Sequence, residues 1–133
     1  WIFRTARAIP IAGAREDAAR MQQALDEIDA ALADGELVCI FPEGALTKDG
    51  AIAKFKSGVE KILERRAVPV LPMALRNMWT SMWSKRDSRL RRMRVPRRFR
   101  AHVEVIAGAP VAAAEASAER LEAQVRQLRG DAP

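Results

Sequence analysis

A carboxylate and a glycine follow directly on an apolar run in the segment Phe41-Pro42-Glu43-Gly44. The run itself, Glu36–Phe41, is short and bounded by Gly35 and Pro42, a pattern typical of a strand buried on both faces. A glycine after such a strand lets a ligand approach the backbone, and a carboxylate accepts hydrogen bonds from hydroxyl groups. We therefore expect a binding site at this strand end.

Positive charge limits the kinds of partner that this site can serve. The 133 residues carry a formal net charge of +6, and 49% of them are hydrophobic, enough for one globular domain with its own core. The charge indicates an anionic partner, which could be nucleic acid, an anionic membrane surface or a phosphorylated substrate. Charge alone does not choose among the three.

The elements that would position the site alternate along the first half of the chain. Ala8–Ile11 predicts a short edge strand, and Glu16–Asp34 carries apolar residues at helical spacing. A second helix is predicted from Gly58 to Arg66, opened by a capping box Ser57-x-x-Glu60, and Val68–Leu75 predicts a further buried strand. This order predicts an α/β fold with a mostly parallel sheet and flanking helices.

The second half has a different composition. Nine basic residues and a single acid lie between Lys85 and Arg100, which predicts a basic surface segment. Phe99–Ala107 alternates as a half-buried strand should, with Val103 and Val105 on the inner face. We expect a turn at Gly108–Pro110 and a final helix over Ala114–Arg129.

Other features describe the setting of the domain. The single cysteine, Cys39, lies inside the apolar run, so we expect a buried structural thiol and a reducing compartment. No apolar run approaches the roughly 18 residues of a membrane-spanning helix. Because the chain starts at Trp1 within a strand-like sequence, we expect residues 1–133 to be a single domain that lacks its natural N-terminal segment.

Several motifs in order resemble the glycerolipid and lysophospholipid acyltransferase superfamily. These are Phe41-Pro42-Glu43-Gly44, Phe55-Lys56-x-Gly58 and Val68-Pro69-Val70-Leu71-Pro72, preceded by Ile2-Phe3-Arg4, and together they cover roughly Trp1 to Ser84. The combination of Glu36-Leu37-Val38 with Ala45-Leu46-Thr47 is most similar to bacterial members, including acyltransferase domains fused to membrane transporters.

The resemblance implies a membrane-associated enzyme of phospholipid biosynthesis. It would transfer a fatty acyl group from acyl-CoA or acyl carrier protein to a hydroxyl of a lysophospholipid or glycerol phosphate, with no bound cofactor and no metal site. The implied substrate-binding residues are Arg4, Phe41, Pro42, Glu43, Gly44, Thr47, Lys56 and Gly58. Arginine offers a planar fork of donors to phosphate oxygens, which suits this acceptor.

The family's catalytic block is absent from this sequence. In the family a histidine in a His-x-x-x-x-Asp block takes the hydroxyl proton as general base. The only histidine here is His102, followed five residues later by Ala107, and we interpret it as a surface residue. The resemblance therefore implies that this chain holds no catalytic residue and is inactive alone. Truncation and a naturally inactive relative both fit that absence.

A second departure concerns the cation that meets the phosphate. Many family members have threonine and arginine after the Glu-Gly pair, where this chain has Ala45 and Leu46. Arg4, Lys48, Lys54 or Lys56 could replace this cation. Alternatively, the acceptor is not a simple phosphomonoester. Glu43 has an alternative role too, as a capping residue or as a salt-bridge partner of Lys48 or Lys56.

The basic segment 85–100 leaves three interpretations open. With tryptophans at the interface, it could anchor the domain on anionic lipid at the cytoplasmic face of the membrane. The residues assigned to that surface are Trp79, Trp83, Arg91, Arg92, Arg97 and Arg98. It could equally be a solvated loop, or the chain could be a noncatalytic basic module for anionic lipid surfaces or nucleic acid. Nucleic acid is disfavoured, because no nucleic-acid-binding motif accompanies the charge.

Overall fold

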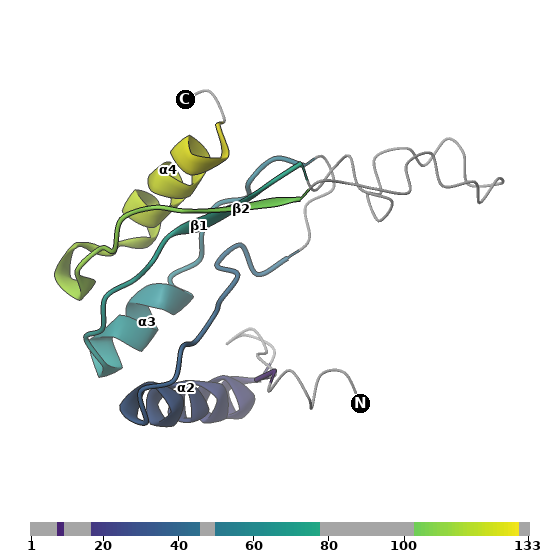
Figure 1. Ribbon diagram of the computed structural model, residues 1–133. Coiled ribbons are helices and arrows are strands. Elements are labelled where there is room, and N and C mark those ends of the chain that lie inside the picture. The colour runs from purple at the N-terminus through teal and green to yellow at the C-terminus, as the bar shows by residue number, and fades with distance from the viewer. Residues whose placement is uncertain (1–7, 10–16, 46–49, 78–102, 131–133) are drawn as a thin grey trace, which may run out of the picture.

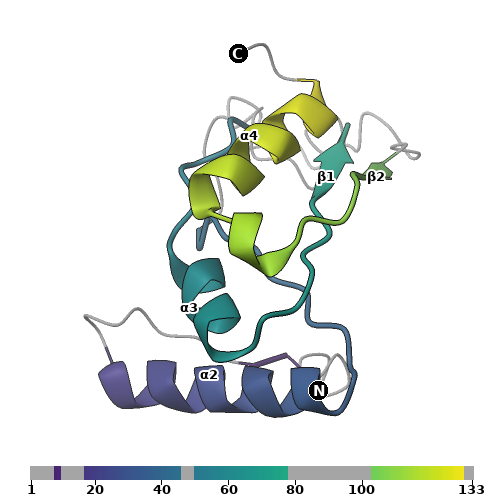
Figure 2. The same cartoon turned by 90° about the vertical axis from the view of Figure 1, so that its left-hand side faces the viewer.

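The computed structural model describes residues 8–9, 17–45, 50–77 and 103–130. In chain order these form α2 (Ala18–Ala33), α3 (Gly58–Arg65), β1 (Met73–Arg76), β2 (Glu104–Ala107), a short 3-10 turn η3 (Ala113–Glu115) and α4 (Ala118–Arg129). Helices α2, α3 and α4 lie one above another, and the paired strands β1 and β2 run beside α4 (Figures 1 and 2). Within the described part of the chain, no helix is long and apolar enough to cross a lipid bilayer.

Helix α2 confirms the amphipathic helix predicted over Glu16–Asp34. Asp17 begins it by accepting a hydrogen bond from the Arg20 N–H at 2.9 Å, and Ala24 and Ile28 are its buried side chains. The helix packs on α3, where Arg66 binds the Asp29 carboxylate through two nitrogens at 2.7 and 3.2 Å. This ion pair lowers the pKa of Asp29 through the hydrogen bond from Arg66.

Helix α3 forms where it was predicted, but the capping box is wrong. The Ser57 side chain makes no capping hydrogen bond. Glu60 instead reaches the start of α4, where its Oε1 accepts a hydrogen bond from the Ala118 N–H at 2.9 Å. Two chain segments 58 residues apart are joined there, because a helix N-terminus carries unsatisfied donors that a carboxylate can accept.

The sheet of the described residues is antiparallel, whereas a mostly parallel sheet was expected. β1 and β2 pair from Met73 opposite Ala107 to Arg76 opposite Glu104. Helices and strands are both present, as an α/β chain requires, but these described strands form no parallel pair. Ala8 and Ile9 belong to no strand, and Pro10 and Ile11 lie outside the described residues.

The predicted turn at Gly108–Pro110 is also wrong, since the pairing continues through it. The Gly108 N–H donates to the Pro72 carbonyl at 2.9 Å, and Val70 and Val111 exchange two hydrogen bonds of 2.8 Å. Two residues separate Val70 from Met73 while three separate Ala107 from Val111, so the second segment bulges by one residue. A bulge tolerates Pro110, which has no N–H to give to a ladder.

The segment Glu36–Phe41 is extended but is not a strand. Leu37 is fully exposed, Phe41 is 76% exposed and Cys39 is exposed, so the expected buried strand and buried thiol are both wrong. A strand buried on both faces needs partners along its edges and cover on its faces. The described residues supply no strand partner at this position, and they cover it in part, where Ile40 packs against the core.

Helix α4 covers one face of the strand pair, and this reverses the faces predicted for β2. Arg76 on the covered face donates from Nε to the Leu128 carbonyl at 2.9 Å. Val103 and Val105, expected on the inner face, are 41% and 59% exposed, and Met73 and Leu75 are also exposed. The alternation was predicted correctly, but the covering helix selects the opposite face.

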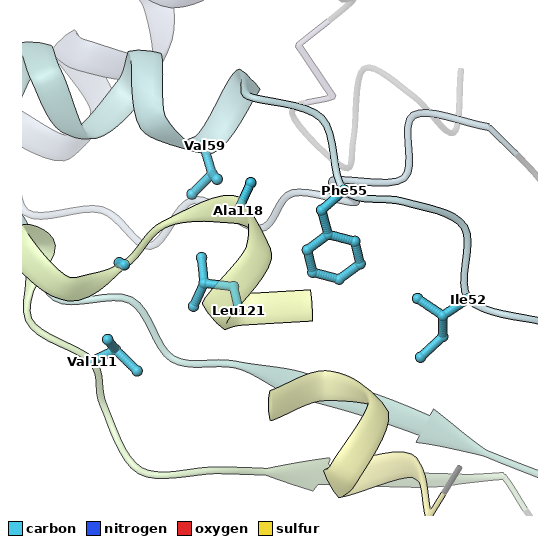
Figure 3. Close-up of a cluster of buried hydrophobic side chains, with 7 residues drawn as sticks. Ile52, Phe55, Val59, Val111, Ala118 and Leu121 are labelled. Atoms are coloured by element: carbon cyan, nitrogen blue, oxygen red, sulfur yellow. The ribbon is translucent and has the colours of Figure 1, made fainter. Parts of the chain in front are cut away.

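The main hydrophobic core lies between α3, α4 and the segment before α3. Phe55, Ile52 and Val59 meet Leu121 and Ala118 of α4, with Val111 at the strand side (Figure 3). α4 thereby confirms the predicted final helix, and its Leu121 is 4% exposed. Burying a side chain of this size stabilises a fold by roughly 1.5–3 kcal/mol, so α4 is integral to the fold.

The two roles possible for Ser57 and Glu60 predict different effects of mutation. We expect Glu60→Ala to lower the free energy of unfolding by about 1–2 kcal/mol, because the Ala118 N–H loses a charged acceptor. Ser57→Ala should change it by less than about 0.5 kcal/mol, as is usual for an exposed surface position. Urea denaturation of both variants measures this. Equal losses would favour the capping box.

Candidate functional site

The turn at the centre of the site is closed by backbone hydrogen bonds. The Gly44 N–H donates to the Phe41 carbonyl at 3.1 Å, and the Lys56 N–H donates to the Pro42 carbonyl at 2.9 Å. Pro42 is the second residue of this turn, a position where proline is common because its ring fixes the backbone angle φ. The turn is thus joined to the segment that precedes α3. We call residues 41–45 and 52–56 together the Glu43 loop.

Glu43 is fixed by a backbone donor within the Glu43 loop. Its Oε2 accepts a hydrogen bond from the Ala53 N–H at 2.7 Å, and the side chain is half-buried. The salt-bridge alternative with Lys56 is not what the structure gives, and Lys48 lies outside the described residues. In the described part of the chain only this one oxygen of Glu43 has a partner, which leaves the carboxylate able to accept a second hydrogen bond.

Lys56 lies against the open face of Gly44. A Cβ added at Gly44 would sit 2.8 Å from Lys56 Nζ and 3.1 Å from its Cδ and Cε. Gly44 also has φ +63°, a conformation that favours glycine. The absence of a side chain at Gly44 therefore leaves room for Lys56, and the Glu43 loop carries both an ammonium and a carboxylate.

Helix α4 fixes the backbone of the Glu43 loop from the other side. Glu122 Oε2 accepts from the Phe55 N–H at 2.9 Å, and its Oε1 pairs with Arg126 at 3.0 Å. Arg126 in turn donates to the Ile52 carbonyl at 2.7 Å, and Arg129 donates to the Gly50 carbonyl at 2.7 Å. Neither Glu122 nor Arg126 was predicted as a site residue.

The hydrogen bond from Phe55, more than the pairing with Arg126, lowers the pKa of Glu122. A lowered pKa means that this carboxylate stabilises the fold above its unfolded-state pKa. The contribution is lost as pH falls through the folded-state value. The contacts of Glu122 are therefore fully formed at neutral pH.

The structure brings together only some of the predicted site residues. Pro42, Glu43, Gly44 and Lys56 share the Glu43 loop, and Phe41 is exposed at its edge. Gly58 is the first residue of α3. The remaining predicted positions lie outside the described residues: Arg4, Thr47, Trp79, Trp83, Arg91, Arg92, Arg97 and Arg98. His102, interpreted as a surface residue, also lies outside them.

A separate open groove of about 380 Å³ lies between α2 and α3, away from the Glu43 loop. Its lining is Ala18, Met21, Gln22, Leu25, Lys61, Glu64 and Arg65. Arg65 is engaged there with Asp26 at 2.6 Å. Glu64 and Lys61 also line this groove, but none of the residues of the acyltransferase-like motifs does, so we place the candidate site at the Glu43 loop.

Gly44 and Gly35 form a matched pair for testing the lysine contact. Both have positive φ, but a Cβ at Gly35 would meet nothing within 4 Å. We expect either glycine-to-alanine change to cost on the order of 1 kcal/mol of unfolding free energy through backbone strain. Only Gly44→Ala should displace the Lys56 side chain, measured as a shift of its Nζ-attached carbon in NMR spectra. An identical shift in Gly35→Ala would contradict the contact.

The chain matches known proteins over the region that contains this loop. A family model described as Acyltransferase matches residues 1–76. A protein of Mycoplasma pneumoniae named as a probable 1-acyl-sn-glycerol-3-phosphate acyltransferase is 28% identical over 112 residues, which are 84% of this chain and 41% of that protein. The chain thus spans less than half the length of this curated relative. No solved structure matches it significantly.

The family match confirms the resemblance indicated by the motifs around Phe41, Phe55 and Val68, and it covers more than half of the 133 residues. This chain belongs to the acyltransferase family of the glycerolipid acyltransferase superfamily.

Proposed function

We propose that these residues form the acceptor-binding part of an enzyme that acylates a lysophospholipid or glycerol phosphate. The observation that supports this most is the Glu43 loop, which carries a lysine ammonium and a carboxylate with one oxygen that has no partner among the described residues. The relative's name, an acyltransferase for 1-acylglycerol 3-phosphate, agrees with an acceptor that carries hydroxyl and phosphate groups.

The proposed reaction needs both kinds of group. The acceptor hydroxyl oxygen attacks the thioester carbonyl carbon, the carbon–sulfur bond breaks, and the thiol of coenzyme A or acyl carrier protein leaves. Glu43 would accept a hydrogen bond from an acceptor hydroxyl, and Lys56 would meet the phosphate. The hydroxyl proton must pass to a general base, a role for which the described residues of this site offer no histidine.

The remaining parts of the proposal concern the surroundings of the site. We place the enzyme at an anionic membrane surface on the cytoplasmic side, since the basic segment 85–100 would gain about 1 kcal/mol per cation near such a surface. We further propose that the mostly parallel sheet belongs to the complete acyltransferase unit. The exposed apolar side chains of Leu37 and Phe41 support further elements packing there.

Acyl transfer by the complete product of the gene tests the proposal. With acyl-CoA or acyl carrier protein as donor, we expect turnover on lysophosphatidic acid or glycerol 3-phosphate, and at least tenfold less for Glu43→Ala. Residues 1–133 alone should show no turnover, because the sequence lacks the His-x-x-x-x-Asp block. Absence of turnover by the complete product on every acceptor would contradict the proposal. Salt-sensitive binding to anionic lipid or nucleic acid that is unchanged in Glu43→Ala would favour the noncatalytic basic module.

A lysine pair tests which cation meets the phosphate. Lys56→Gln should raise KM for a phosphate-bearing acceptor about tenfold, since loss of a charged hydrogen bond costs about 1.5–3 kcal/mol. Lys54→Gln removes the same charge two residues away and should leave KM within about twofold. Steady-state kinetics on lysophosphatidic acid measure both. If KM rises in Lys54→Gln and not in Lys56→Gln, Lys56 is not the residue that contacts the phosphate.

A further inference from the structure

Helix α4 lies beyond residues 1–76, where the family model matches, and yet it contacts the Glu43 loop directly. Its two loop contacts flank Ala53, whose N–H holds Glu43. On one side Arg126 binds the Ile52 carbonyl at 2.7 Å, and on the other Glu122 binds the Phe55 N–H at 2.9 Å. The backbone that carries the donor to Glu43 is therefore held one residue before Ala53 and two residues after it.

We propose that Glu122 and Arg126 are positioning residues, which set the orientation of the Glu43 carboxylate through the backbone of residues 52–55. This inference rests on the proposed function, in which Glu43 binds the acceptor. Glu122 and Arg126 touch no substrate in this assignment. They act on the acceptor only through Ala53 and Glu43.

Burial makes these contacts effective. The Glu122 side chain is 19% exposed and Arg126 is 37% exposed, so both charges are partly removed from water and each has its partner. Hydrogen bonds to charged groups are about twice as strong as neutral ones. Ile52 and Phe55 are themselves 7% and 8% exposed, and they pack with Leu121 of the same helix.

The alternative is that the Glu122–Arg126 pair only stabilises α4, as an i,i+4 ion pair does in an isolated helix. The two roles differ in what a charge exchange restores. Glu122→Arg with Arg126→Glu keeps an ion pair on the helix surface. It places a cation at the Phe55 N–H, however, and a carboxylate at the Ile52 carbonyl, so both backbone contacts are lost.

The first experiment measures amide hydrogen exchange in the complete protein by mass spectrometry. We expect the peptide that contains residues 52–56 to exchange at least tenfold faster in Glu122→Ala and in the exchanged double variant. Glu122→Gln keeps an acceptor for Phe55 and should show a smaller increase. Glu119→Gln, which neutralises an exposed acid of the same helix, should match the wild type. Wild-type exchange in the double variant would overturn the proposal.

The second experiment measures acyl transfer by the same variants. KM for lysophosphatidic acid should rise about tenfold in Glu122→Ala and in the double variant, with kcat within about threefold of the wild type. Faster exchange with an unchanged KM would overturn the positioning role. If the complete wild-type protein transfers no acyl group, the proposed function fails, and the exchange measurement still decides whether Glu122 and Arg126 hold the loop.

Discussion

The packing of α4 against residues 50–59 is the interaction on which the rest of the described structure depends. Leu121 and Ala118 close the core around Ile52, Phe55 and Val59. The same helix covers one face of the β1–β2 pair, and it receives Glu60 from α3 at its first residue. Because one helix meets the loop, the strands and α3, a displacement of α4 would alter all three together.

The polar contacts of α4 follow from the same constraint. A segment such as Gly50–Phe55, which has no helix or strand of its own, must find partners for its backbone groups wherever it is buried. Glu122, Arg126 and Arg129 supply these partners from successive turns of one helix face. Arg76 does the reverse, using a β1 side chain to satisfy the Leu128 carbonyl near the end of α4. The irregular segment therefore has side-chain partners for backbone groups that a helix or strand would satisfy within itself.

Local patterns predicted the helices well and the sheet poorly. α2 and α4 follow from apolar spacing; Asp17 and Ser117, which were not predicted as starting residues, each accept a hydrogen bond from an N–H in the first turn. The buried strand predicted over Glu36–Phe41 is wrong because an apolar run is buried only where neighbouring segments pair with it. The assignment of the inner face of β2 is wrong because alternation defines two faces of a strand without showing which one a helix covers.

The candidate site was predictable to the same extent. The order of the motifs around Phe41 and Phe55 identified the family, and Pro42, Glu43, Gly44 and Lys56 do lie together. Glu122 and Arg126 could be recognised only as an i,i+4 pair on a helix, since their loop partners are about 70 residues away in sequence. Long-range contacts of this kind leave no local pattern.

Glu43 and Glu122 both accept hydrogen bonds from the backbone of residues 52–56, but their surroundings differ. Glu122 engages a backbone donor with one oxygen and Arg126 with the other, and the resulting low pKa keeps it charged and committed to the fold. Among the described residues, Glu43 uses only one oxygen, which accepts from the Ala53 N–H, and it precedes the glycine against which Lys56 lies. A carboxylate oxygen that has no partner among the described residues can accept a hydrogen bond from a ligand hydroxyl. The proposed binding role therefore falls to Glu43, and the proposed role of Glu122 is to hold the backbone that orients it.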